Sequence, residues 1–175
     1  MDRLKEDLMA CSGGSKFKVI STIIFNSNFK AIKNYRIANY LYKKLHFRLL
    51  PKWLHYRNRI KYAIDIDYRA EISGGFKIVH GIGVVIGKDV VAGKNFTVYQ
   101  GVTCGGNMGK EKIVNGKIIS QPYISDNVTM YAHSSAFGPV CIGENSAIGA
   151  GAVVLKDVPE RSVFYCKQET SYKSI

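Results

Sequence analysis

The sequence predicts a mainly β protein, a parallel β-helix that follows an α-helical segment at the N-terminus. Three observations predict it. After position 63 an apolar residue recurs every six residues over about ninety residues, helical spacing is confined to the chain before that point, and the excess basic charge lies in that same first part. At 175 residues the chain has the length of one domain with a helical appendage.

The first part of the chain, residues 1–64, is expected to be helical. Pro51 is expected to end or redirect a first helix, because its ring removes a backbone donor and clashes with the preceding turn. A second short helix is expected over residues 52–63. In residues 29–50 the apolar side chains lie near helical spacing, with lysines and arginines between them: Ile32, Tyr35, Ile37, Leu41 and Leu45.

The basic charge of the protein belongs to this helical segment. Residues 1–64 hold 14 Lys and Arg against 3 Asp and Glu, whereas residues 65–175 hold 11 against 10. A basic helix rich in aromatic residues is suited to an anionic membrane surface. The alternative is an ordinary solvated face on a helix that packs against its own domain. No motif that reads DNA or RNA is present, so nucleic acid is not an expected partner.

The sequence shows no signal for export or for membrane insertion. Its charged start lacks an apolar h-region, and no apolar run approaches the roughly 18 to 20 residues that cross a bilayer. The four cysteines are spread without a CxxC pair, which argues against a thiolate metal site or a disulfide framework and favours a reducing compartment. The expected location is the cytoplasm, with peripheral attachment at the inner face of the cell membrane as a hypothesis for the basic segment.

The six-residue period is the strongest signal in the sequence. Each unit can form one short strand and one tight corner with the periodic side chain pointing inward, and three units then make one triangular turn. Stacked turns bury a continuous apolar column, which helices can cap at one end. The periodic residues are Ile66, Ile72, Ile78, Ile86, Ala92, Val98, Ile124, Met130, Ala136, Ile142, Ile148 and Val154.

The period also sets the expected domain organisation. Residues 1–64 form the basic helical segment, and residues 65–160 form the β-helix domain. A loop insertion interrupts the period at about residues 106–122, and residues 161–175 form a C-terminal tail. The insertion carries three lysines and is expected to help shape an acceptor pocket.

Five stretches of the sequence resemble the serine O-acetyltransferase branch of the hexapeptide-repeat acyltransferases, and they occur in that branch's order. They are YRIANYLYKK, AIDIDYRAEI, HGIGVVIG, QGVTCGG and IGAGAVVLKDVP, and the resemblance runs from about Phe29 to Pro159. It implies a left-handed β-helix, a handedness that the period alone does not decide. It also implies acetyl transfer from acetyl-CoA, without a metal, by a homotrimer whose active sites lie between subunits.

The resemblance implies catalytic roles for His80 and Asp65. In that family a histidine at this place is the general base, and it is paired with an aspartate fifteen residues earlier, which here is Asp65. Fifteen residues is close to one turn of about eighteen, so the two side chains are expected to approach each other near one corner. The carboxylate would orient the imidazole and select its tautomer. A buried structural histidine is the alternative interpretation.

The same resemblance implies further site residues. Gly105 and Gly106 are expected to bring backbone amides to the oxyanion, because glycine allows a close approach of the main chain to a ligand. The pantetheine arm of CoA is expected along later turns, past Ala132. Lys156 or Arg161 is expected to meet the CoA phosphates, with ordinary surface charge as the alternative.

The residues expected at the acceptor differ from the family pattern. Val79 stands where the family has an aspartate immediately before the catalytic histidine, and Ser120 and Gln121 stand where it has an Arg-His pair. A zwitterionic amino acid needs charged partners for its ammonium and carboxylate groups. These departures predict a sugar hydroxyl or a surface-polysaccharide precursor as the acceptor, with serine O-acetyltransferase of cysteine biosynthesis as the first alternative.

Two further classes of protein share some of these sequence features. A carbonic-anhydrase-like metalloenzyme on the same prism needs three clustered histidines, but only His80 and His133 lie in the repeat, which disfavours it. A non-enzymatic basic scaffold or binding protein is compatible with the charge. It would be favoured if His80 were dispensable for function.

Overall fold

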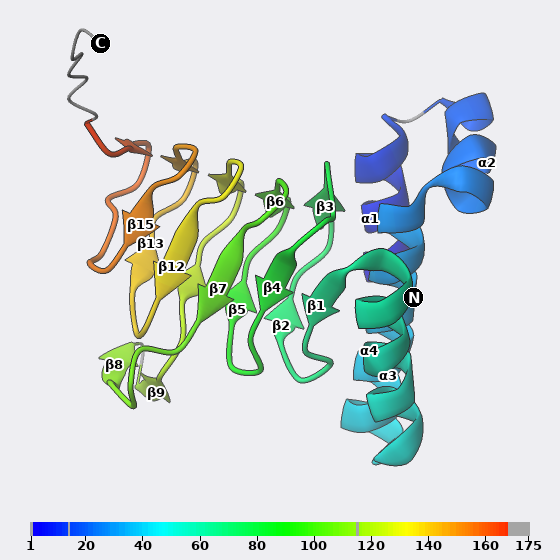
Figure 1. The fold of residues 1–175 in the computed structure, drawn as a ribbon, viewed down its shortest axis with the longest axis horizontal. Coiled ribbons are helices and arrows are strands. Elements are labelled where there is room, and N and C mark those ends of the chain that lie inside the picture. Colours follow the sequence, from blue (N-terminus) through cyan, green and yellow to red (C-terminus); the bar gives the residue numbers. More distant parts are fainter. Residues whose placement is uncertain (1, 14, 115, 168–175) are drawn as a thin grey trace, which may run out of the picture.

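Four helices precede a β-solenoid in the computed structural model, which describes residues 2–13, 15–114 and 116–167 (Figure 1). Asn26 separates two of these helices, because its side chain accepts a hydrogen bond from the backbone N–H of Phe29 at 2.9 Å and so caps the next helix. The helices are α1 (Asp2–Ser12), α2 (Lys16–Phe25), α3 (Ser27–Leu45) and α4 (Leu49–Tyr62).

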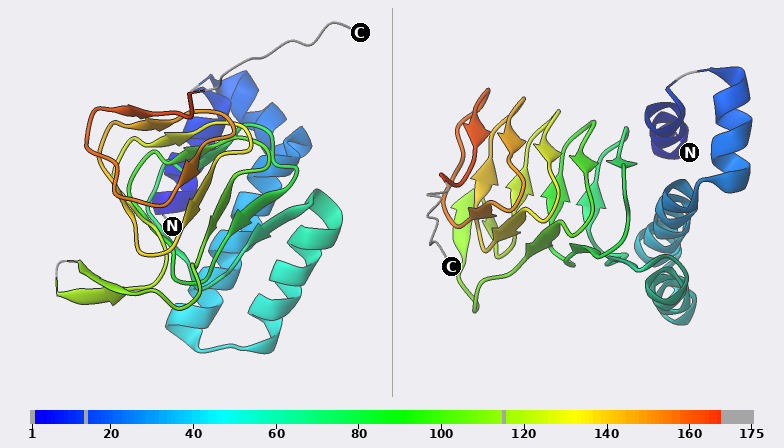
Figure 2. Two further views of the ribbon diagram at one scale, coloured as in Figure 1. Left: turned by 60° about the vertical axis from the view of Figure 1, so that its left-hand side comes forward. Right: turned by 45° about the horizontal axis from the view of Figure 1, so that its top comes forward.

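The solenoid has three parallel sheets, one on each side of a prism (Figure 2). The first contains β1 (Ile64–Ile66), β4 (Val84–Ile86), β7 (Thr103–Gly105), β12 (Ser135–Phe137) and β15 (Val153–Val154). The second contains β2 (Glu71–Ile72), β5 (Val91–Ala92), β10 (Tyr123–Ile124) and β13 (Cys141–Ile142). The third contains β3 (Lys77–Ile78), β6 (Thr97–Val98), β11 (Thr129–Met130), β14 (Ala147–Ile148) and β16 (Val163–Phe164).

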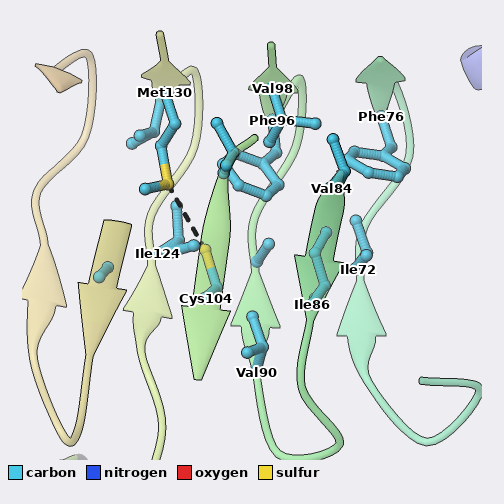
Figure 3. Close-up of a cluster of buried hydrophobic side chains, with 14 of the residues drawn as sticks. Ile72, Phe76, Val84, Ile86, Val90, Phe96, Val98, Cys104, Ile124 and Met130 are labelled. Atoms are coloured by element: carbon cyan, nitrogen blue, oxygen red, sulfur yellow. Dashed lines mark hydrogen bonds between the residues drawn. The ribbon is translucent and has the colours of Figure 1, made fainter. Parts of the chain in front are cut away.

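The core of the solenoid is the column that the period predicts. All twelve periodic residues are at most 3% exposed, so the expected inward direction of these side chains is confirmed. Phe76 and Phe96 stack with ring centroids 5.7 Å apart, one coil above the other (Figure 3). Cys104 also points into this column, where its Sγ lies 3.5 Å from Sδ of Met130 (Figure 3).

The helices cover one end of this column (Figures 1 and 2). Ile32 and Tyr35 of α3 are buried there, and the Tyr35 hydroxyl donates to the carbonyl of Ala70 at 2.9 Å. Arg36 pairs with the fully buried Asp7 of α1 at 2.8 Å and donates to the carbonyl of Ile72 at 2.5 Å. This charge pair therefore joins two helices to the first coil of the solenoid.

Parts of the structure differ from the sequence expectation. Pro51 lies in the first turn of α4, where a missing backbone donor costs nothing, rather than between two helices. Ile37 and Leu45, two of the apolar residues that lie near helical spacing, are 41% and 50% exposed. The insertion is an antiparallel hairpin of β8 (Lys112–Val114) and β9 (Lys117–Ile119), and β16 extends the solenoid into the segment expected as a tail. Residues 168–175 of that tail lie outside the described residues.

Candidate active site

His80 lies at the corner between β3 and β4, and its side chain is exposed. The backbone on either side of it is held in place. The N–H of Val79 donates to the carbonyl of Val98 at 3.0 Å, and the side-chain amide of Asn28 on α3 donates to the carbonyl of Val79 at 3.0 Å. A Cβ added at the buried Gly81 would lie 2.4 Å from Oδ1 of Asn28. The imidazole is therefore presented to solvent by a rigid main chain.

Aromatic side chains continue from His80 along the same edge of the prism. The ring of Tyr99, at the end of β6, has its centroid 6.3 Å from that of His80 at an interplanar angle of 62°. Tyr131, one coil further on, lies 5.2 Å from Tyr99. These three rings come from successive coils, so the repeat places them in a row.

A lane of small residues runs beside this row. Gly83, Gly101 and Gly151 occupy equivalent corners with φ between 66° and 76°, a conformation that favours glycine. His133 occupies the same conformation, φ 58°, and its ring covers Gly101, where an added Cβ would meet Nδ1 of His133 at 2.3 Å. Nothing lies within 4 Å of a Cβ added at Gly151, and Ala132 lies next to His133 in this corner.

Asp65 is bound by a helix and not by His80. Nε2 of His55, on α4, lies 2.5 Å from Oδ1 of Asp65, and Nε of Arg59 lies 3.4 Å from Oδ2. The reason is the register of the strands. Ile64 pairs with Val84, twenty residues later, so the first coil is longer than an eighteen-residue repeat. His80 therefore lies in the corner before β4, whereas Asp65 lies within β1, the strand that pairs with β4. The expectation that the two side chains pair directly is not met in this structure.

The other expected site residues lie at different places on the prism. Gly105 ends β7, with the exposed Gly106 after it, and the carbonyl of Gly105 accepts from the N–H of Gly138 at 2.9 Å. Lys156 and Arg161 are exposed near the far end of the solenoid.

Ser120 and Gln121 lie at the opposite end of β4 from His80. The Ser120 hydroxyl donates to Oδ2 of Asp89 at 3.3 Å, and Oε1 of Gln121 accepts from the N–H of Asp89 at 3.3 Å. Gln121 also covers Gly87, where an added Cβ would lie 2.2 Å from its Oε1. Within one protomer these two residues are therefore separated from His80 by the length of a strand.

His80 lines neither of two hollows that lie on the described part of the chain. One, of about 620 Å³, lies along β5 and β10 and includes Gly93, Asp126 and Glu144. The other, of about 590 Å³, lies under the β8–β9 hairpin and includes Ser120, Lys117 and Glu71. Among the described residues no group of three or more His, Cys, Asp or Glu side chains is placed to hold a metal ion.

Several residues of this region were not selected from the sequence. His55 and Asn28 belong to helices, so the six-residue period carries no information about them. Tyr99 and Tyr131 do carry a signal, since each directly follows a periodic residue, Val98 and Met130, and must emerge at a corner.

Comparison with known proteins shows the family of this chain. The chain is 42% identical over 164 residues to a serine acetyltransferase of Bacillus subtilis, a match that covers 91% of this chain and 71% of that protein. The chain belongs to the serine acetyltransferase family. No family model matched the sequence.

Solved serine acetyltransferases share the fold of this family member. The serine complex of the Neisseria gonorrhoeae enzyme matches with a TM-score of 0.81 and 30% identity over 93% of this chain. A serine acetyltransferase in complex with CoA matches with a TM-score of 0.81 and 26% identity over 94% of it. The left-handed hexapeptide-repeat β-helix with an N-terminal helical segment, expected from the resemblance, is thereby confirmed.

The comparisons also correct one expectation and limit another. The relatives are serine acetyltransferases, so they give no support to polysaccharide O-acetylation as the leading function. The chain spans 64% and 66% of the two solved chains, which are therefore considerably longer than this one. One of the solved serine acetyltransferases is a complex with CoA, which supports acetyl-CoA as the co-substrate of this family member.

Proposed function

We propose that this protein transfers an acetyl group from acetyl-CoA to the hydroxyl of L-serine. The observation that carries the proposal is the 42% identity to the Bacillus subtilis serine acetyltransferase over 91% of this chain. The similarity to a serine acetyltransferase solved with serine supports the same acceptor. The proposal replaces the sugar acceptor that the departures at Val79, Ser120 and Gln121 predicted.

His80 is the proposed general base of the reaction. Its exposed imidazole takes the proton of the serine hydroxyl as that oxygen attacks the thioester carbonyl, and a tetrahedral oxyanion forms. Collapse of the oxyanion re-forms the carbonyl and breaks the C–S bond. The departing CoA thiolate takes the proton from the imidazolium, so the products are O-acetylserine and CoA thiol. A positioned base contributes roughly 10²–10⁴-fold to such a step.

The small-residue lane beside His80 suits the extended arm of acetyl-CoA. Gly83 and Gly151 present bare main chain there, since a Cβ at Gly83 would meet nothing closer than 3.6 Å. We place the pantetheine arm over this lane and Ala132, with Lys156 toward the phosphates and the backbone of Gly105 and Gly106 toward the oxyanion.

The proposed assembly is a homotrimer with the active sites between subunits. His80 and the pair Ser120 and Gln121 lie at opposite ends of β4 in one protomer, so one acceptor cannot meet them all on the same chain. A neighbouring protomer that presents its Gln121 end to His80 would complete the site. The row of His80, Tyr99 and Tyr131 would then be covered by that neighbour.

A sugar hydroxyl remains the second candidate acceptor, on one specific observation. Val79 adds no charge next to His80, and Ser120 and Gln121 are neutral, with Ser120 engaged by Asp89. A serine zwitterion that lacks charged partners for both its ends would bind weakly. A neutral hydroxyl donor has no such requirement.

Release of CoA thiol measured with acetyl-CoA and candidate acceptors tests the proposal. We expect turnover with L-serine, none with L-alanine (which lacks the hydroxyl), and loss of turnover in His80→Ala. Turnover with a sugar panel and none with L-serine would replace the acceptor while keeping the chemistry. If wild type and His80→Ala release thiol equally with every acceptor, the proposed reaction is wrong.

A further inference from the structure

The outer surface of the helical end is apolar where a water-soluble helix is usually polar. Helix α2 buries Thr22, a polar residue, and exposes a run of large apolar side chains. The exposed fractions are 82% for Phe17, 59% for Ile20, 47% for Ile23, 50% for Ile24 and 78% for Phe25. In Figures 1 and 2 this helix lies at the far end of the molecule, away from the solenoid.

Helix α4 also exposes large apolar side chains on its outer side. Its inner side is formed by Pro51, Leu54 and Asn58, which are buried, so the opposite side faces away from the solenoid. That outer side carries an apolar stripe at helical spacing: Leu49 at 81% exposed, Trp53 at 52%, Tyr56 at 60% and Ile60 at 69%. Trp and Tyr on such a stripe have an apolar body and a polar tip, as interfacial residues do.

The charge on these helices has one sign. No Asp or Glu occurs between Asp7 and Asp65, whereas twelve Lys and Arg do. Lys18, Lys33, Lys44, Lys52 and Arg57 are among those with exposed side chains. The guanidinium of Arg57 lies 5.4 Å from the centre of the Trp53 ring, so basic and aromatic groups are interleaved on the surface.

This combination selects an anionic partner with an apolar layer. A second copy of the same face would bring like charges together without any acidic residue to pair with them, which disfavours self-association there. A soluble polyanion would satisfy the charges but would leave the large apolar side chains in water. An anionic bilayer meets both requirements, with phosphate headgroups for the lysines and acyl chains for the apolar residues.

We propose that the outer surface of α2, α3 and α4 binds the surface of anionic lipid bilayers and attaches the solenoid to it. This is attachment at the surface: no single described helix is long and apolar enough to span a bilayer, and the pair α1 and α2, which passes by length and composition together, is bent by 103°. His80 lies between β3 and β4 of the solenoid and is therefore not part of this helical surface.

Co-sedimentation of the full chain with vesicles tests this inference. Vesicles of phosphatidylcholine alone are compared with vesicles of equal parts phosphatidylcholine and phosphatidylglycerol. We expect binding to the anionic vesicles only, weakened on raising the salt from about 0.05 M to about 0.5 M, because that shortens the range of charge attraction to a few ångströms. Equal binding to both vesicle types, or to neither, would overturn the proposal.

Two variants separate the charge from the apolar contribution. A Lys33→Gln, Lys44→Gln, Lys52→Gln triple variant should bind about a hundredfold more weakly, since each basic residue near an anionic surface contributes roughly fivefold. A Phe17→Ser, Ile20→Ser, Ile24→Ser variant should bind at least tenfold more weakly. Matched controls on the solenoid, Lys88→Gln, Lys94→Gln, Lys110→Gln and Ile113→Ser, Ile118→Ser, Leu155→Ser, should bind as the wild type does.

Competing partners give distinguishable outcomes. If light scattering shows that the apolar variant lowers the number of copies per assembly while vesicles never bind, the surface is a protein interface and the proposal is wrong. A second outcome is that a soluble acidic polysaccharide binds equally to the wild type and to the apolar variant, while vesicles bind to neither. In that case the surface binds its partner through charge alone, and the proposal is also wrong.

Discussion

Nε2 of His55, on helix α4, lies 2.5 Å from Oδ1 of Asp65, on the first strand of the solenoid. The side chains are 19% and 35% exposed, so this hydrogen bond lies at the edge of the helix–solenoid junction. Arg59, one turn further along α4, approaches the second oxygen of the same carboxylate at 3.4 Å. One helix therefore determines the position of the carboxylate that the family resemblance assigned to His80.

We expect His55→Ala to destabilise the protein by about 1.5–2 kcal/mol, the lower part of the range for a hydrogen bond to a charged group, because the pair is partly hydrated. Urea unfolding followed by circular dichroism measures the change. His55→Gln, which keeps a donor near Asp65, is the control and should recover about half of the loss. Identical stabilities for wild type and His55→Ala would show that the bond contributes nothing.

Whether Asp65 acts through His80 can be decided by a double-mutant cycle. His80→Ala should lower kcat by roughly 10²–10⁴-fold with the Kd of CoA unchanged. If Asp65 orients His80 during turnover, Asp65→Asn lowers kcat in the wild-type background and has no further effect in the His80→Ala background. Independent, multiplicative losses would show that Asp65 serves only the junction with α4.

The buried pair of Asp7 and Arg36 should be the most sensitive point of the helical cap. Asp7→Ala leaves the guanidinium of Arg36 partly buried without its carboxylate, and it removes the acceptor for the N–H of Phe76 at 2.9 Å. We expect a loss of about 3–5 kcal/mol in the free energy of unfolding. The double variant Asp7→Ala, Arg36→Met should recover part of it, because the unpaired charge is gone. A loss below about 1 kcal/mol in Asp7→Ala would show that the ion pair of Asp7 and Arg36 does not hold the helices to the first coil.

The pair of Lys43 and Glu71 predicts a dependence of stability on pH. Their side chains meet at 2.6 Å between α3 and β2, and Lys43 holds the pKa of the Glu71 carboxyl below its ordinary value. Because the folded pKa is depressed, the pair stabilises the protein above the ordinary carboxyl pKa of about 4.3, and this contribution is lost as the pH falls through the lower folded value.

The measurement is a comparison of wild type with Lys43→Met at a series of pH values. Glu71 is largely exposed, so the difference in unfolding free energy should stay below about 1 kcal/mol at pH 7 and shrink in high salt. The difference should shrink as the pH falls below about 4.3, and the two proteins should unfold alike only below the depressed folded pKa of Glu71. A difference that is constant from neutral to acidic pH would exclude an ionic contribution from Glu71.

Thiol labelling should separate the cysteines by burial. Burial raises the pKa of the Cys104 thiol to about 12, so almost none of this thiol is ionised at pH 8. Cys166 is exposed and should react with an aromatic disulfide within the mixing phase, while Cys104 should react only after unfolding. Peptide mapping of the labelled sites identifies the order. Labelling of Cys104 in the folded protein would show that the solenoid opens at β7.

The architecture of the solenoid could be predicted because its contacts repeat. Ile86 and Cys104, for example, are partners one coil apart, and the same relation recurs in every turn, so a period in the sequence reports the inward direction directly. The helical cap was predicted only as helices. Ile37 and Leu45 are exposed although they lie near helical spacing, because spacing identifies an apolar face but not which face is covered.

The sequence by itself determined the coiled core and the uneven charge, since each depends on residues that are close along the chain or equivalent in the repeat. Tertiary structure alone decided that Asp65 meets His55, that Asn28 holds the backbone before His80, and that α2 turns its apolar side chains outward. These three relationships depend on how separate helices dock onto the first coil. Docking is set by the fit of whole surfaces, which no local spacing encodes.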